Sequence, residues 1–218
     1  MAWKALSSAR PDVITGTLQS ADIDVAHLSF EAGSSPVSPV ESSGKQATLN
    51  LQGKVAGLEE ELLALHKVSD TIPPTVVGKI NLVTYNPIHY NLEVVPVNGA
   101  SLPAGVNART IGDHLNKVYS QAVVEWNVTM SPDLKVLLGE TFDEGETGLL
   151  SNYTDDMKKV LRAYGPLRDN TYYLFIIQEP RNPSTLGYMP RSRQAGFVFS
   201  GPHEGSAAEF HKTIAHEI

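Results

Sequence analysis

The sequence has 218 residues, of which 41% are hydrophobic and 19% charged, and its formal net charge is −7. This composition is typical of a folded chain that forms one large or two small domains, and it argues against wholesale disorder. The negative charge and the lack of a Lys/Arg cluster argue against nucleic-acid binding. No apolar run reaches the roughly 20 residues of a membrane-spanning helix. Because the chain has no Cys, any metal would be held by His, carboxylate or water.

The first 75 residues give weak structural signals. Residues 1–46 are rich in Ser, Gly and Pro, and Gly33–Gly44 is predicted to be a loop. The next segment, 48–65, fits two patterns: Leu49 and Leu51 suit a strand, whereas other apolar residues have helical spacing. We therefore expect 1–75 to be an ancillary segment that is β-rich or irregular, with a pro-segment as one alternative.

Clearer patterns begin at Val76. The sequence predicts strands at Ile80–Tyr85, Tyr90–Val97, Ala122–Met130, Tyr172–Ile177 and Ala195–Ser200, alternating with helices at Thr110–Gln121, at Asp155–Tyr164 and from Ser206 onward. Such alternation predicts an α/β (α+β) fold with a mixed, mostly parallel sheet, packed helices and an antiparallel edge strand. We expect Ala195–Ser200 to lie near that edge.

Helix starts are marked by residues that cap the first turn. Thr110 and Thr154 are the predicted N-caps of the first two helices, and Ser206 with Glu209 forms the capping box of the last. In that last helix Phe210 and Ile214 share one face, which we expect to pack on the sheet. His216 lies nearly opposite, and the chain is expected to end inside the helix because no stop signal follows.

The end of this helix carries the main functional hypothesis. Thr213–Ile218, T-I-A-H-E-I, resembles the opening of the His-Glu-x-x-His helix of zinc-dependent metallopeptidases, the zincins, which include the metzincins. The resemblance implies that His216 is a zinc ligand and Glu217 the catalytic general base, with the other ligands beyond Ile218. It also implies a strand that holds an extended peptide substrate through Gly196, Phe197, Val198 and Phe199.

On this hypothesis 76–218 is the N-terminal part of a zincin-like domain. The parent protein would hydrolyse peptide bonds with zinc-activated water, whereas this chain alone would be inactive and would bind Zn weakly or not at all. A peptide or protein would be the substrate, and a secreted or cell-surface location follows by analogy. The alternative is a non-enzymatic binding or surface-interaction module whose terminal helix is structural.

Other candidate residues are less specific. His203 and His211 are expected to be loop and surface residues, because His211 and His216 are five apart and do not share a helical face. Tyr188 is a candidate for assisting an oxyanion. A loop with three arginines is a candidate for binding a substrate carboxylate, although a solvated loop explains it equally well: Arg181, Arg191 and Arg193.

Overall fold

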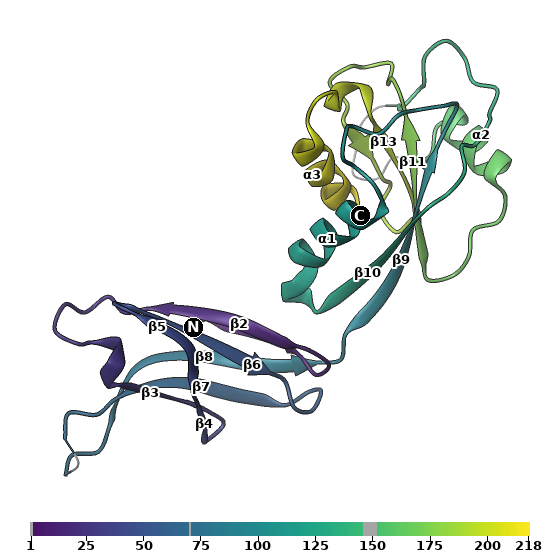
Figure 1. Cartoon of the computed structure of the whole chain (residues 1–218). Helices are drawn as coiled ribbons and strands as arrows, with labels where there is room; N and C mark the ends of the chain where they lie inside the picture. The colour runs from purple at the N-terminus through teal and green to yellow at the C-terminus, as the bar shows by residue number, and fades with distance from the viewer. Residues whose placement is uncertain (1, 70, 146–151) are drawn as a thin grey trace. The chain divides into compact units, whose positions relative to one another are not determined.

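The computed structural model describes residues 2–69, 71–145 and 152–218, and the chain divides into two compact units (Figure 1). The first, here called the β unit, comprises Met1–Ile88 and Gln121–Val123. The second, the α/β unit, comprises His89–Ser120 and Val124–Ile218. The sequence-based division falls between residues 75 and 76. The two divisions differ because the strand that begins at Thr75 pairs with other strands of the β unit.

The β unit contains two sheets. The larger has five strands, in the order β1 (Trp3–Ser7), β8 (Thr75–Tyr85), β7 (Glu59–His66), β3 (Leu28–Ala32) and β4 (Ser35–Val37). The smaller has three, in the order β2 (Pro11–Thr17), β6 (Gln46–Gln52) and β5 (Pro39–Ser43). A short 3-10 turn, η1 (Val25–His27), precedes β3. β1 and β8 run parallel, and the other described pairings within these two sheets are antiparallel.

Side chains from both sheets form one apolar core in the β unit. Its buried members alternate along their strands, as expected for sheets with one covered face: Leu6, Val25, Phe30, Ala32, Ala47, Leu49, Leu51, Leu62 and Leu82. The ambiguous segment 48–65 is therefore two strands rather than a helix. The predicted loop Gly33–Gly44 also contains β4 and β5, because Gly33 and Gly44 take the positive φ angles of tight turns at its ends.

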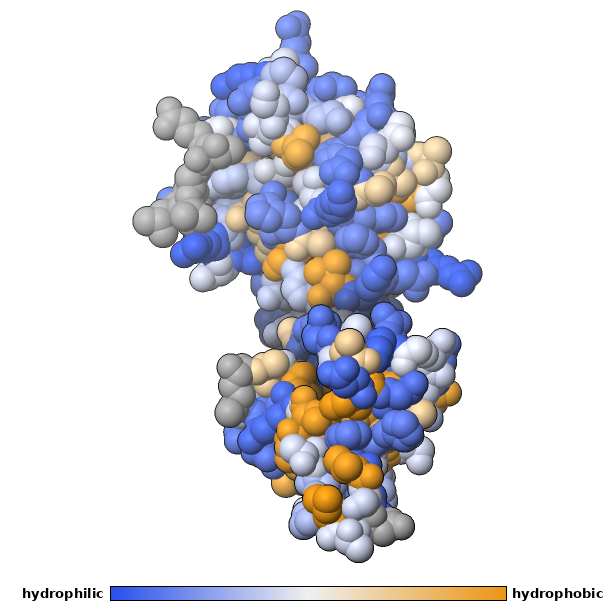
Figure 2. Space-filling model, turned by 90° about the vertical axis from the view of Figure 1, so that its left-hand side faces the viewer, coloured by the Kyte–Doolittle hydropathy of each residue, from blue (hydrophilic) through white to orange (hydrophobic). Residues whose placement is uncertain are grey.

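Most of the exposed large apolar side chains among the described residues belong to the β unit, and in Figure 2 apolar side chains gather in the lower half of the view. An apolar hollow of about 150 Å³ lies between the sheets. Its lining includes Leu18, Val25, Leu28, Phe30, Ala47 and Val77.

The α/β unit is built on one sheet. Its strand order is β10 (Val124–Met130), β9 (Ile88–Pro96), β11 (Thr171–Ile177), β13 (Ala195–Phe199) and β12 (Gly187–Tyr188). β9, β11 and β13 run parallel, whereas β12 is antiparallel to β13 and forms one edge. The predicted class, an α+β fold with a mixed sheet, is confirmed. The narrower prediction, that this unit is a zincin-like subdomain, is not supported.

Helices cover both faces of this sheet (Figure 1). α1 (Ala108–Val118) and α3 (Ala207–Glu217) pack on one face, and α2 (Asp155–Tyr164) packs on the other. Two 3-10 turns, η2 (Tyr119–Ala122) and η3 (Gly201–His203), follow α1 and precede α3. Leu174 and Ile176 of β11 point to the first face, and Tyr173 and Phe175 to the second. Both faces are apolar, which explains the unbroken apolar run of β11.

The helix caps match the sequence prediction in two of three cases. The Thr154 side chain accepts a hydrogen bond from the Met157 N–H, and the Ser206 side chain accepts one from the Glu209 N–H. The prediction for α1 was wrong by three residues. Asn107 is its N-cap. The Asn107 side chain accepts a hydrogen bond from the Thr110 N–H, and the Thr110 hydroxyl accepts one from the Asn107 N–H, which together form a capping box.

Candidate functional site at the free edge of β12

The last helix places its functional candidates at the edge of the sheet. Phe210 and Ile214 are completely buried between α3 and the sheet, as their spacing predicted. His216 is exposed, whereas Glu217 is only partly exposed. Packing of the apolar face thus fixes the rotation of α3 and directs its final turn toward β12.

Glu217 lies directly against Gly187, the first residue of β12. A Cβ atom added to Gly187 would stand 2.7 Å from Cγ of Glu217 and 3.1 Å from its Oε1. Real Cβ atoms do not come this close to a carbon atom, so any larger residue at 187 would displace the glutamate side chain. Gly187 therefore belongs to the site, although nothing in the sequence pattern singled it out.

The Met189 N–H also acts on the Glu217 carboxylate, because it favours the ionised form and so opposes the rise of the pKa. The Leu186 carbonyl accepts from the Phe199 N–H at 3.0 Å, so the polar groups of Leu186 face β13. Successive residues of an extended strand direct their backbone groups to opposite sides. Those of Gly187 and Met189 therefore face away from β13, and the carboxylate lies at the free edge of the sheet.

This position changes the acidity of Glu217. Burial against β12 raises its pKa, and this effect outweighs the opposing effects of His216 and of the Met189 N–H. A carboxyl group with a raised pKa exchanges protons at a less acidic pH than an exposed one. The site therefore combines a proton-exchanging group with the outer side of β12, which pairs with no described strand other than β13.

The strand predicted to hold substrate occupies another position. Gly196, Phe197, Val198 and Phe199 are buried in β13, which pairs with β11 on one side and with β12 on the other. Their backbone groups already belong to two ladders, so an added strand has no place beside them. β13 is thus one strand in from the edge where the sequence placed it, and the strand available for pairing is β12.

His203 and His211 are not simple surface residues. His203 is buried, with its Nδ1 2.7 Å from the Phe199 carbonyl oxygen and its Nε2 2.8 Å from Thr213 Oγ1. Because a carbonyl only accepts, Nδ1 carries the proton and Nε2 accepts from Thr213. His203 therefore links η3 to α3. His211 stacks on His114 of α1 with ring centroids 5.4 Å apart, and burial followed by the charge of His114 lowers its pKa.

The remaining candidates contribute to loops and packing. The Arg181 guanidinium lies 3.2 Å from Asp143, and the Arg193 guanidinium lies over the Tyr153 ring at 5.9 Å. Arg191 is exposed. The Tyr188 hydroxyl is buried without a hydrogen-bond partner among the described residues. It belongs to the core on the α2 face, opposite the face that α3 covers.

Comparisons with known proteins give only weak likenesses. No family model and no curated protein matches the chain. A 2,6-sialyltransferase of Photobacterium sp. JT-ISH-224, solved with CMP and lactose, aligns at 11% identity and a TM-score of 0.30. A sialyltransferase of Photobacterium damsela aligns at 12% identity and a TM-score of 0.26. The chain covers 35% of each of them, and they cover 81% and 79% of this chain. Likenesses this weak support no argument about its activity.

The prediction of a zinc metallopeptidase is contradicted. Within residues 2–69, 71–145 and 152–218, no group of three or more His, Cys, Asp or Glu side chains could hold a metal ion. A zinc site needs at least three protein ligands, and His216 stands exposed without two others beside it. The zinc cofactor and the metalloendopeptidase activity are accordingly withdrawn. The alternative, a non-enzymatic module with a purely structural terminal helix, has no support either.

Among the helices described, none combines the length and the apolar character that crossing a membrane requires. The role of a peptide or protein as the partner remains a proposal.

Proposed function

We propose that the α/β unit binds an extended polypeptide as an added strand on β12, under the control of the protonation state of Glu217. The observation that supports this most directly is the contact of Glu217 with Gly187 of β12, where a Cβ atom added to the glycine would stand 2.7 Å from the Glu217 Cγ. Strand addition supplies backbone hydrogen bonds, and neighbouring side chains supply selectivity. The catalytic role predicted for Glu217 stays a prediction.

The carboxylate occupies the position that a bound chain would use. An incoming strand presents a carbonyl oxygen to the Met189 N–H, and that oxygen is repelled by an ionised carboxylate beside it. Once Glu217 is protonated, its O–H donates a hydrogen bond instead. The bound state is therefore favoured by the neutral carboxyl group, and the raised pKa of Glu217 brings that form closer to physiological pH.

The test uses a library of short fluorescein-labelled peptides, with binding to the full chain measured by fluorescence anisotropy at several pH values. We expect binding to strengthen as the pH falls through the pKa of Glu217. Glu217→Gln carries a permanently neutral donor, so it should bind tightly at every pH. Glu209→Gln, an exposed α3 residue paired with Lys212, is the matched control and should keep the wild-type pH dependence.

A second comparison tests the geometry. The best peptide is resynthesised with a methyl group on one backbone nitrogen at a time. Addition to one edge uses alternate amides, so methylation should weaken binding at every second position only. Equal effects at all positions, or a Glu217→Gln variant with the wild-type pH dependence, would contradict the proposal. Failure of every peptide to bind would do the same.

A further inference from the structure

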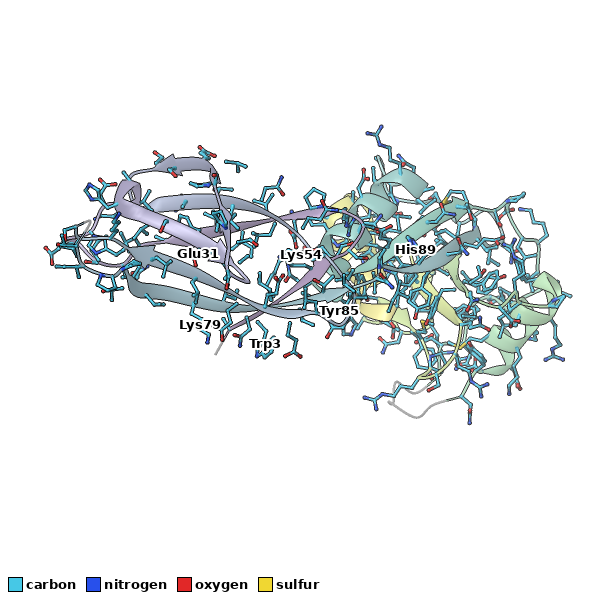
Figure 3. All side chains as sticks on the ribbon, turned by 90° about the horizontal axis from the view of Figure 1, so that it is seen from below. Trp3, Glu31, Lys54, Lys79, Tyr85 and His89 are labelled. Atoms are coloured by element: carbon cyan, nitrogen blue, oxygen red, sulfur yellow. The ribbon has the colours of Figure 1, made fainter. Side chains whose placement is uncertain are left out.

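A second candidate site lies on the β unit, far along the sequence from Glu217. The outer face of its five-stranded sheet has a depression of about 330 Å³. Strands β1, β8 and β7 line it with Trp3, Glu59, Glu60, Glu61, Lys79 and Asn81. Figure 3 shows Trp3 and Lys79 on the same side of the ribbon.

The register of the sheet brings these side chains together. Trp3 lies beside Asn81, and Asn81 lies opposite Glu61, so the three form one row across adjacent strands. Lys79 and Glu59 are two residues away on their own strands and share the face. The residues are scattered over the first 81 positions, yet pairing makes them neighbours.

Trp3 is the unusual member of this row. Its side chain forms no aromatic pair with another residue in the described part of the chain, and the residue is 56% exposed. The second tryptophan, Trp126, is only 7% exposed in the core of the α/β unit. A large ring left open beside a depression is available to stack on a flat ligand, and indole retains one polar N–H at its rim.

Asn81 forms the floor of the depression. It is only 8% exposed, and no hydrogen bond joins its side chain to another described residue. A primary amide has two donor hydrogens and an accepting oxygen, so it offers both kinds of partner. The Asn81 amide is not among the described buried groups that lack a hydrogen-bond partner, so its polar atoms reach the depression that the residue lines. The amide can therefore pair with a polar ligand there.

The walls add charged donors and acceptors. The Lys79 ammonium pairs with the Glu61 carboxylate, and Lys54 pairs with Glu60 at 2.8 Å. Glu59 makes no ion pair within the described part of the chain and is exposed. Acceptors, donors and an apolar ring thus surround one depression. A ligand that fits must itself both donate and accept hydrogen bonds and must present a flat apolar face.

We propose that this face of the β unit binds a neutral carbohydrate. A pyranose ring has an apolar C–H face for Trp3 and a rim of hydroxyls that pair with Asn81, Lys79 and Glu59. A small cation would also stack on Trp3 and is attracted by the three carboxylates of the lining, but it has no groups that pair with both the Asn81 amide and the Lys79 ammonium, so it is the competing outcome of the test. An anionic ligand meets the carboxylates of Glu59 and Glu61, and an apolar one leaves Asn81 unpaired.

Tyr85 extends this surface along the strand. It is 50% exposed and follows Asn81 by four residues, so it lies on the same face of β8. At about 3.3 Å per residue, the two positions are roughly 13 Å apart. One sugar ring cannot reach both aromatic side chains. We therefore assign the site to an oligosaccharide, with Trp3 as the primary platform and Tyr85 as the secondary one.

The experiment uses the full chain and three sets of neutral oligosaccharides: hexose, N-acetylhexosamine and pentose, each as mono- and tetrasaccharides. Binding is measured by calorimetry, and by protection of tryptophan fluorescence from acrylamide, which reaches exposed Trp3 and not buried Trp126. We expect at least one tetrasaccharide to bind and to protect Trp3. Trp3→Ala should weaken that binding by about 30-fold, the loss typical of a central aromatic contact.

Further variants separate a binding role from a structural one. Asn81→Ala should weaken both mono- and tetrasaccharides, whereas Tyr85→Ala should weaken only the tetrasaccharide. Glu41→Gln, an exposed β5 residue on the other sheet, is the matched control and should change neither. Circular dichroism checks that each variant is folded, and Trp3→Phe should restore part of the binding lost by Trp3→Ala.

Three results would overturn the proposal. The first is that no tetrasaccharide binds or protects Trp3. The second is that folded Trp3→Ala binds as the wild type does. The third is that tetramethylammonium, tested alongside, protects Trp3 more effectively than any sugar, which would make the depression a cation site.

Discussion

The two units differ in how their sheets are covered, and this difference decides where each can meet a ligand. In the α/β unit, helices pack on both faces of the sheet, so the backbone groups of the sheet itself are open to a ligand at an edge. In the β unit, one face of the larger sheet packs on the core and the other presents Trp3, Asn81 and Glu61. We infer that the first unit recognises ligands with its edge and the second with its open face.

Substitutions in the core of each unit should have the largest effect on the free energy of unfolding. Phe175 is completely buried between β11 and α2, and Leu49 is 3% exposed between the sheets of the β unit. Phe175→Ala should lower the free energy of unfolding of the α/β unit by about 4 kcal/mol, and Leu49→Ala that of the β unit by about 3 kcal/mol. Urea unfolding followed separately through Trp126 and Trp3 fluorescence measures this.

That experiment also asks whether the units are energetically separate. Each variant should shift the transition of its own unit alone. If either variant shifts both transitions equally, the two units unfold together, and the contrast between them does not extend to stability. Phe175→Leu and Leu49→Met are the conservative controls and should shift the transitions much less.

Removal of a buried carboxylate should have an intermediate effect on the free energy of unfolding. Glu93 on β9 is 8% exposed and accepts hydrogen bonds from Ser131, from the Tyr164 hydroxyl at 2.7 Å and from the Arg168 guanidinium. Burial alone raises its pKa, but these partners outweigh burial and leave the pKa lowered. Glu93→Ala should cost the α/β unit about 2 kcal/mol near neutral pH, because polar partners are left unpaired.

The lowered pKa of Glu93 also determines how the stability of the α/β unit depends on pH. The stabilisation by ionised Glu93 is fully present above the usual carboxyl pKa of 4.5 and is lost as the pH falls through the lower folded-state value. In Glu93→Ala, unfolding of the α/β unit should therefore depend less on pH in this acidic range. Urea titrations at a series of acidic pH values check this. An unchanged pH dependence would show that the carboxylate is not ionised in the folded unit.

The smallest effect is expected on the open face of the β unit. The Glu61 and Lys79 side chains are 51% and 35% exposed, so their ion pair is largely solvated. Glu61→Gln should change the free energy of unfolding by less than about 0.5 kcal/mol. Thermal unfolding followed through Trp3 measures it. A loss as large as that of Glu93→Ala would mean that the pair holds the sheet together instead of serving a ligand.

Predictions from the sequence were most accurate where they depended on residues that lie close together in the chain. Thr154 and Ser206 cap their helices as predicted, because capping depends on residues three positions apart. The apolar run of β11 likewise predicted a strand covered on both faces. In the β unit, the first seven strands have only three to eight residues, and the turns between them are rich in Ser and Gly, so the periodic signal is weak. Seven of its strands were therefore missed or left undecided.

Both candidate sites depend on contacts between distant segments, which no short pattern reveals. Glu217 was a candidate from its place beside His216, but Gly187 and Met189 enter its site only through the packing of α3 on β12. Trp3, Asn81 and Glu61 become neighbours through the register of three strands. The zinc prediction was overturned for a related reason: a dipeptide suggests one ligand, whereas a metal site requires several side chains to converge.

The short length of β12 bears on self-association. A long, flat edge strand recruits copies of the same chain and leads to aggregation, and proteins avoid this with short edges and nearby proline. β12 has two residues, and Pro190, two positions after its end, has no N–H to offer a neighbouring strand. An edge of this kind is too small to template a fibril, yet it leaves room for one brief, specific pairing.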